Sequence, residues 1–130
     1  MKIEHKEAAF VDERGVITDV FVGAPKEHCT VISTKKGAVR GNHYHKVSRQ
    51  WDFIVSGSFR VFGKREGGQI EEATVSASDL ISWESGEAHE FIALEDSVFI
   101  TFVDGVRGGA NFESDTYRLE TPLHEEIRTQ

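Results

Sequence analysis

Short runs of β-branched and aromatic residues, separated by turn residues, recur along most of this 130-residue chain. Such residues favour strands, whereas Gly, Ser, Asn and Asp favour the turns between strands. The runs predict strands at residues 28–34, 51–56, 58–62, 71–75, 80–83, 90–94 and 97–103. Closely spaced turns between short strands are typical of an antiparallel sandwich or barrel. The sequence therefore predicts an all-β protein.

The two ends of the chain carry weaker patterns. Residues 1–22 are expected to add one or two edge strands, with 16–22 (VITDVFV) as the best candidate, and residues 120–130 are expected to be irregular or a short helix. The length suits a single domain covering 1–130. No stretch approaches the roughly 20 apolar residues of a membrane span, and the first residues lack the apolar run of a secretory signal. We therefore expect a cytoplasmic protein that does not enter the membrane.

Cys29 is the only cysteine. One cysteine excludes an internal disulfide and a cluster of thiolate ligands, so a metal would have to be held by His, Gln or carboxylate side chains. Cys29 itself is predicted to be a small core residue.

Charge is spread unevenly over the sequence. The net charge of −7 argues against a general nucleic-acid binder. Residues 35–65, however, hold eight cations and a single anion, Asp52, which gives this segment +7 and the remainder −14. A basic segment on an acidic protein favours an anionic small ligand such as a phosphate or a nucleotide sugar, although solvated surface residues would give the same pattern.

The histidines of this basic segment are the best candidates for a functional site. His43 and His45 are two residues apart in an expected strand, so their rings should face the same side and Tyr44 the opposite side. Gln50 follows five residues later, and His89 stands in the turn segment GEAHEF. Such a cluster could hold a metal or transfer protons. His5, His28 and His124 lie outside it and are predicted to be surface residues.

The order of these residues resembles the cupin superfamily of small jelly-roll barrels. The first cupin motif is Gly, five residues, His-x-His, three or four residues, Glu, six residues, Gly, and it matches Gly37, His43, His45 and Gly57, with Gln50 in place of Glu. The second motif matches at Gly86 and His89 and departs at Ser78, Glu84 and Ala93. The resemblance covers residues 28–103 and implies a single-domain cupin barrel.

In cupins the matching side chains converge on a metal inside the barrel. Carried over, the ligands would be His43, His45, Gln50 and His89. Three imidazoles suit one divalent ion such as zinc, iron, nickel or manganese, but an amide is a weaker ligand than a carboxylate and leaves the charge of the ion uncompensated. The site could equally require no cofactor.

Within the cupins, RGNHYHK followed by Gln50 resembles the subgroup that acts on nucleotide-activated sugars. Its members include dTDP-4-keto-6-deoxyglucose 3,4-ketoisomerases, dTDP-4-dehydrorhamnose 3,5-epimerases and capsule-synthesis cupin domains. The resemblance implies a homodimeric isomerase or epimerase of a nucleotide-linked 4-keto-6-deoxy sugar, used in surface polysaccharide synthesis. His43 would act as the base beside the ketone, and His45 would shuttle the proton or polarise the ketone.

Substrate-binding residues follow from the same resemblance and from the basic segment. They are Arg40, Tyr44, Arg49, Gln50, Trp51 and Arg60. Arg40 could stabilise an oxyanion or clamp a diphosphate, Tyr44 could instead pack or contact a second subunit, and Tyr117 could reach the site as a proton donor or pack elsewhere. Trp51 and Trp83 could each stack on a nucleotide base, but a Trp in a small barrel is more often a core or rim residue. Two alternatives remain: a metal-dependent cupin oxygenase, and a sugar- or metal-binding cupin without turnover.

Overall fold

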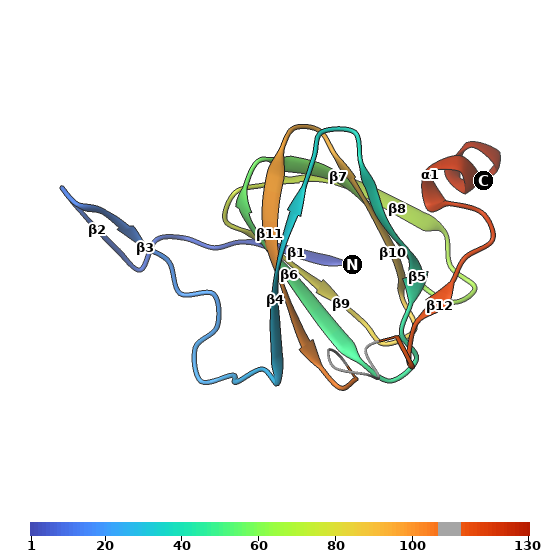
Figure 1. Ribbon diagram of the computed structural model, residues 1–130, viewed down its shortest axis with the longest axis horizontal. Helices are drawn as coiled ribbons and strands as arrows, with labels where there is room; N and C mark the ends of the chain where they lie inside the picture. Colours follow the sequence, from blue (N-terminus) through green and yellow to red (C-terminus); the bar gives the residue numbers. More distant parts are fainter. Residues whose placement is uncertain (107–112) are drawn as a thin grey trace.

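Two five-stranded antiparallel sheets form the body of the protein in the computed structural model, which describes residues 1–106 and 113–130. One sheet has the order β1-β9-β6-β11-β4 and the other β12-β5-β10-β7-β8. The strands of the first sheet are β1 (Lys2–His5), β9 (Asp79–Trp83), β6 (Arg49–Ser56), β11 (Ser97–Asp104) and β4 (His28–Thr34). Those of the second are β12 (Tyr117–Arg118), β5 (Val39–Tyr44), β10 (Ala88–Ala93), β7 (Ser58–Lys64) and β8 (Ile70–Ser76). Figure 1 shows the sheets facing each other as a barrel.

The predicted all-β jelly-roll fold is confirmed. Each strand expected between residues 28 and 103 is present, with ends that differ by at most two residues from the prediction. The sheets also extend beyond that range, because β1 pairs with β9 and β12 pairs with β5. No helix in the described part of the chain is long and apolar enough to cross a membrane.

Side chains that face inward at alternate positions along the strands fill the barrel. Inward-facing residues from both sheets form one apolar cluster: Ile54, Phe59, Val61, Val75, Ile81, Trp83, Phe91, Ala93 and Phe99. Phe91 and Phe99 stack with their ring centroids 5.0 Å apart, and Phe59 packs edge-on against both. Trp83 is a core residue, as predicted, and it fits because position 63 is glycine: a Cβ there would lie 2.9 Å from the indole ring.

The chain ends add two further features. Residues 10–17 form a separate hairpin of β2 (Phe10–Asp12) and β3 (Gly15–Ile17), which reaches away from the barrel in Figure 1. The expected strand at 16–22 is therefore mostly wrong, since β3 ends at Ile17. Residues 120–130 were expected to be irregular or a short helix, and they form the short helix α1 (Leu123–Glu126), followed by a 3-10 turn (Ile127–Thr129). Leu123 packs with Phe62 and Ile70 on the outside of the second sheet.

The predicted burial of three residues is wrong. Cys29 is exposed rather than in the core, because it lies on the outer face of the edge strand β4. His124 is half-buried rather than on the surface, because its Nδ1 lies 2.8 Å from the carboxylate of the buried Glu90. His28 is also half-buried, and its Nε2 donates to the carbonyl oxygen of Gly105 at 2.9 Å. His5 is exposed, as predicted.

Candidate functional site

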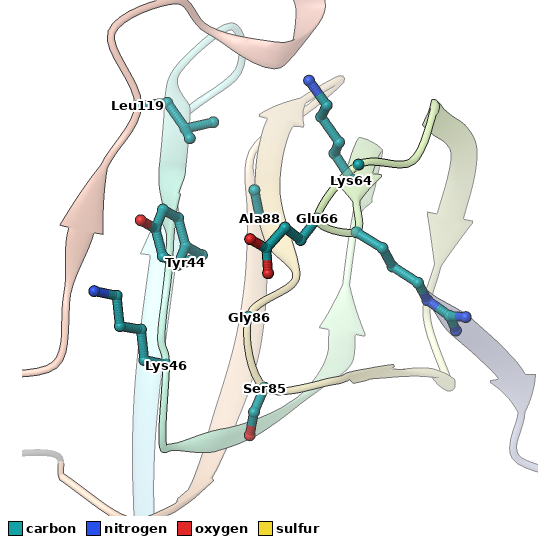
Figure 2. A pocket seen from close by; sticks show the side chains of 10 residues that line it. Tyr44, Lys46, Lys64, Glu66, Ser85, Gly86, Ala88 and Leu119 are labelled. Carbon is teal, nitrogen blue, oxygen red and sulfur yellow. The ribbon is translucent and has the colours of Figure 1, made fainter.

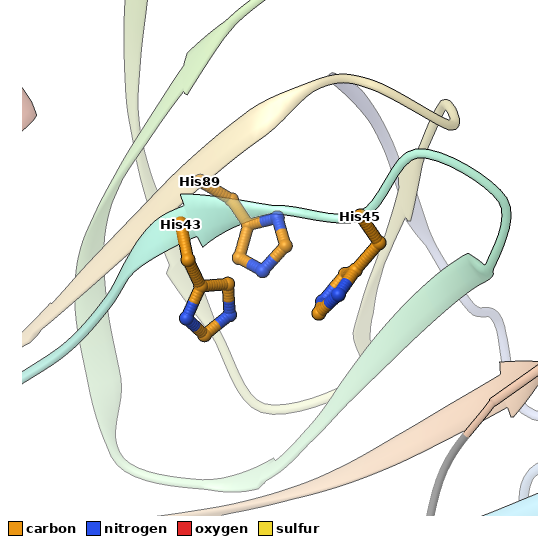
Figure 3. Close-up of side chains that lie close together, drawn as sticks. All are labelled: His43, His45 and His89. Carbon is orange, nitrogen blue, oxygen red and sulfur yellow. The ribbon is translucent and has the colours of Figure 1, made fainter. Parts of the chain in front are cut away.

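Three histidines meet inside one end of the barrel. His43 lies in β5, His45 directly after that strand, and His89 in β10. One ring nitrogen from each lies within 4.8 Å of the others, and Figure 3 shows the three rings turned toward a common space. The prediction that His43 and His45 face the same side is confirmed, and pairing of β5 with β10 brings in His89.

A β-bulge in β5 prepares this arrangement. His43 pairs with His89 and Gly41 pairs with Glu90, so that Asn42 is an extra residue in β5. Gly41 and Asn42 both have positive φ, of 90° and 61°. A Cβ on Gly41 would lie 2.6 Å from the carbonyl oxygen of His89, a distance that real side chains do not adopt. The glycine of the RGNHYH motif is therefore needed for β5 to approach β10 next to the histidines.

The bulged residue also holds the C-terminal segment. The Asn42 carbonyl oxygen accepts from the amide of Leu119 at 2.8 Å, and its side-chain oxygen accepts from the amide of Leu123 at 3.0 Å. Glu90, which is fully buried, accepts from the amide of His124 at 2.9 Å. Residues 119–124 are thus fixed to the outer side of the strands that carry the histidines.

Hydrogen bonds determine the tautomers of two of the imidazoles. The Nδ1 of His45 lies 2.8 Å from the carbonyl oxygen of Asp115, and that of His89 lies 3.3 Å from the carbonyl oxygen of Glu87. A carbonyl oxygen can only accept, so both Nδ1 atoms carry the hydrogen and both Nε2 atoms present a lone pair when the rings are neutral. In the described part of the chain, the buried Nε2 of His89 has no hydrogen-bond partner. A histidine with one nitrogen held by a carbonyl and the other open is the arrangement of a metal ligand or a proton acceptor.

The electrostatic environment keeps His89 neutral. Burial lowers the pKa of His89 well below its usual value, and the neighbouring His43 and His45 lower it further. Its hydrogen bond to Glu87 acts in the opposite direction and is the smallest contribution. His89 is thus able to donate a lone pair but is a poor proton donor near neutral pH.

Asp115 is a site residue that the sequence analysis missed. Its carboxylate accepts from the backbone amides of Lys46, Val47 and Ser48 at 3.0, 3.0 and 2.8 Å. Those amides hold the pKa of the Asp115 carboxyl below its usual value, although its burial acts in the opposite direction. Asp115 therefore fixes the loop after His45 with its side chain while its carbonyl orients the His45 ring.

A cavity of about 360 Å³ opens onto two of the histidines, His43 and His89. His43, Gln50 and His89 lie in its wall together with Arg40 and Arg118. Arg118 was not predicted; it reaches the site because β12 pairs with β5, opposite His43. Arg40 is held by the Thr34 hydroxyl and the Ser33 carbonyl, at 2.8 and 2.9 Å, and Arg118 pairs with Glu113. The predicted site residues Arg40 and Gln50 are thus brought together with the histidines.

Other predicted substrate-binding residues lie elsewhere. Arg49 and Trp51 face the outside of β6, where the Lys26 ammonium lies 4.0 Å from the centre of the indole ring of Trp51. Arg60 pairs with Glu72 on an exposed surface, with a shortest distance of 2.7 Å. None of these three lines the histidine cavity.

Tyr44 also faces away from the histidines, as predicted. It stacks on Tyr117 with ring centroids 5.4 Å apart and contributes to a second pocket of about 530 Å³, shown in Figure 2. Lys46 and Lys64 line the same pocket. Because Tyr117 packs on Tyr44 here, it does not line the histidine cavity as a proton donor would.

Among curated proteins, the chain is similar to parts of longer proteins. No model of a known protein family matches it. An oxalate decarboxylase of Arthroderma benhamiae is 33% identical over 76 residues, which is 57% of this chain and 18% of that protein. A probable oxalate decarboxylase of the same organism is 33% identical over 91 residues, 67% of this chain and 22% of its own length. The chain thus spans about a fifth of the length of these relatives.

Solved structures give longer alignments. The dTDP-4-dehydrorhamnose 3,5-epimerase of Sulfolobus tokodaii superposes with a TM-score of 0.69 and 24% identity, over 79% of this chain and 69% of the epimerase. The capsular polysaccharide assembling protein CapF of Staphylococcus aureus gives 0.65 and 26%, over 86% of this chain and 34% of CapF. A 3,4-ketoisomerase of Helicobacter canadensis superposes with a TM-score of 0.78 and 17% identity, over 98% of this chain and 95% of the ketoisomerase. The chain therefore has a cupin-type jelly-roll fold and is similar in structure to an epimerase and a ketoisomerase of known structure.

Proposed function

We propose that the protein is an isomerase or epimerase of a nucleotide-diphosphate-linked 4-keto-6-deoxy sugar. The observation that carries the proposal is the cavity that is lined by the imidazoles of His43 and His89 together with Arg40 and Arg118. Guanidinium groups bind diphosphate oxygens, and imidazoles transfer protons near neutral pH. The solved structures of an epimerase and a ketoisomerase with this fold support the same class of reaction.

In this proposal His43 removes the proton from the carbon beside the ketone. His43 lines the cavity, and its ring centroid lies 5.0 Å from that of His45 and 4.7 Å from that of His89. The Nε2 lone pair of His45 can accept a hydrogen bond from a protonated neighbour, which helps to move the proton away from the substrate. Arg40 would stabilise the oxygen of the enolate or bind the diphosphate.

The experiment follows deuterium entry from heavy water into a dTDP-4-keto-6-deoxyhexose by NMR, at the carbons beside the ketone. With metal-stripped protein we expect exchange that falls about 100- to 10,000-fold in His43→Ala. His5→Ala is the matched control, because His5 is an exposed histidine outside the site. Absence of exchange with several nucleotide sugars, with and without metal, would contradict the proposal.

A metal-dependent cupin, such as an oxygenase, is the second candidate. It is favoured by the buried, open Nε2 of His89 and by the 4.8 Å grouping of the three imidazole nitrogens. These residues fit a divalent ion: His43, His45 and His89 would hold it with Gln50 beside them. Zinc, iron, nickel or manganese bound there would act as a Lewis acid on a substrate oxygen. Metal analysis after loading, compared between wild type and His89→Ala, tests this candidate.

A cupin that binds a sugar or metal without turnover would bind ligand but show no deuterium exchange at the sugar.

We also propose that the protein forms a homodimer. The hairpin β2–β3 leaves Phe10, Val11, Val16 and Ile17 between 52% and 63% exposed. A two-stranded hairpin is marginally stable alone, so apolar residues on both of its strands favour packing against another surface. Light scattering should give twice the mass of the chain, and Phe10→Ser with Ile17→Ser should lower it. A monomeric wild type would contradict this proposal.

A further inference from the structure

Asp52 is a buried carboxylate inside the barrel that none of the roles above uses. It is fully buried and lies on the same face of β6 as Gln50. Its Oδ2 accepts from Trp83 Nε1 at 2.8 Å and from Gln50 Nε2 at 2.9 Å. Its Oδ1 accepts from the hydroxyl of Thr101 at 2.6 Å and from Gln50 Nε2 at 3.2 Å. Asp52 is thus tied to three strands of one sheet.

This contact determines which way the Gln50 amide faces. A carboxylate has no hydrogen to donate, so only the nitrogen of the amide can bind it. The amide oxygen, on the other side of the planar group, is the atom left for the cavity that Gln50 lines together with His43 and His89. The reverse orientation would place two acceptors against each other in a buried site. We propose that Asp52 is a positioning residue, which turns Gln50 so that the histidine cavity receives an oxygen acceptor.

This orientation restricts what can bind beside Gln50. An acceptor oxygen suits a ligand group that donates a hydrogen bond, such as a sugar hydroxyl, or a divalent cation. It does not suit an enolate or phosphate oxygen, so those anionic atoms must lie nearer the arginines. Position 50 has no carboxylate of its own, but the carboxylate of Asp52 lies next to the Gln50 amide, on the side of the amide nitrogen. The inference depends on the candidate site for its consequence, but not on the reaction.

NMR of the Gln50 side-chain amide tests the orientation without any ligand. In ¹⁵N-labelled protein we expect the Gln50 NH₂ group to exchange with solvent at least about tenfold more slowly than that of Gln69, which is exposed. We also expect a nuclear Overhauser contact with the indole N–H of Trp83, because both groups donate to the same oxygen. Asp52→Leu, which has a similar size but no acceptor for the Gln50 amide, should remove the protection. A Gln50 amide that exchanges as fast as that of Gln69 in wild type would overturn the proposal.

Cobalt binding to the metal-stripped protein tests the consequence, with Co²⁺ alone as the probe. Asp52→Leu is expected to weaken Co²⁺ binding about 10- to 100-fold, as loss of an orienting partner does at other metal sites. Trp83→Phe is the matched control: it removes a different donor to Asp52, so it should cost stability but leave Co²⁺ affinity within about threefold. Equal affinities of wild type and Asp52→Leu would overturn the proposal.

The exchanged pair Gln50→Glu with Asp52→Asn separates positioning from folding. In this double variant the new amide at position 52 can donate to the new carboxylate at position 50, so an oxygen still faces the cavity and the total charge is unchanged. We expect it to recover the Co²⁺ affinity that Asp52→Leu loses, including the case in which Asp52→Leu alone does not fold. A folded double variant with the weak affinity expected of the single variant would count against the proposal. A wild type that takes up no Co²⁺ would instead contradict the metal candidate, and the amide exchange alone would then decide the orientation.

Discussion

The two halves of the barrel interior differ in chemistry although the same strands build both. β6 places Gln50 and Asp52 in one half and Ile54 in the other, and β10 does the same with His89 and Phe91. The apolar half is a packed cluster of aromatic and aliphatic side chains, whereas the other half holds imidazoles, an amide and a carboxylate. Residues two positions apart on one strand therefore serve different purposes: one stabilises the fold and the other lines the candidate site. The packed apolar half supports the geometry of the reactive half.

Removing an aromatic ring from the apolar half should have the largest effect. Phe99→Ala deletes a ring that is 2% exposed and that packs with Phe59 and Phe91. We expect it to lower the free energy of unfolding by about 3–5 kcal/mol, measured by urea denaturation. Val55→Ala, on the exposed face of β6, is the control and should change stability by less than about 1 kcal/mol. Equal losses in the two variants would show that the interior is not packed as described.

Disturbing the bulge should affect the reactive half next. Gly41→Ala places a Cβ against the carbonyl oxygen of His89 at a φ of 90°. We expect a loss of at least about 2 kcal/mol in unfolding free energy and shifted NMR signals of the histidine rings. Gly37→Ala has a φ of 83° but open space around the Cβ, so it should cost only about 1 kcal/mol. If both substitutions cost the same, the close approach of β5 to β10 has no special role.

The neutral His89 predicts how stability depends on pH. Its pKa is lowered by burial and by His43 and His45, so the unfolded chain binds a proton more readily than the folded protein. The stability of the metal-stripped protein should therefore fall as the pH drops below the ordinary histidine value of about 6.5, by up to about 1.4 kcal/mol per pH unit from this group. Urea denaturation of wild type and His89→Gln over this range measures the difference. A variant with the same pH dependence as wild type would refute this prediction.

Changing the outer surface should have the smallest effect. Arg60 is predicted from the sequence to bind substrate, but the structure places it outside the barrel in an exposed pair with Glu72. Arg60→Gln should change the unfolding free energy by less than about 1 kcal/mol. Calorimetric titration with a nucleotide diphosphate should give the same affinity as wild type, in contrast to Arg40→Gln. A large loss of nucleotide affinity in Arg60→Gln would show that Arg60 belongs to the binding site after all.

The sequence predicts the strands and the histidine cluster because both depend on short-range periodicity. Residues two apart share a face, which correctly groups His43 with His45, and the second motif correctly adds His89. The same rule could have found Asp52, a charged residue two positions after Gln50 within an apolar strand. Exposure depends on which strands lie at the edge of a sheet and on long-range contacts, and short-range periodicity contains neither. The burial of Cys29, His28 and His124 was therefore predicted incorrectly.

No local pattern marks Asp115 or Arg118. Both reach the site through pairing and loop contacts with the segment around His43 and His45, and nothing in their own neighbourhood predicts that contact. The positions of Arg49, Trp51 and Arg60 show the converse: being near the motif in sequence does not bring a side chain into the cavity, because alternate residues of a strand face outward.

The hydrogen bond from His45 to Asp115 joins residues 70 positions apart, which has a consequence for biosynthesis. The apolar cluster inside the barrel consists of residues between Ile54 and Phe99, so it can begin to pack before the last part of the chain has left the ribosome. His45 cannot be oriented until Asp115 has emerged and docked. The site is therefore completed late, as expected for contacts of long sequence separation, and a nascent barrel would acquire its core before its capacity to bind a ligand.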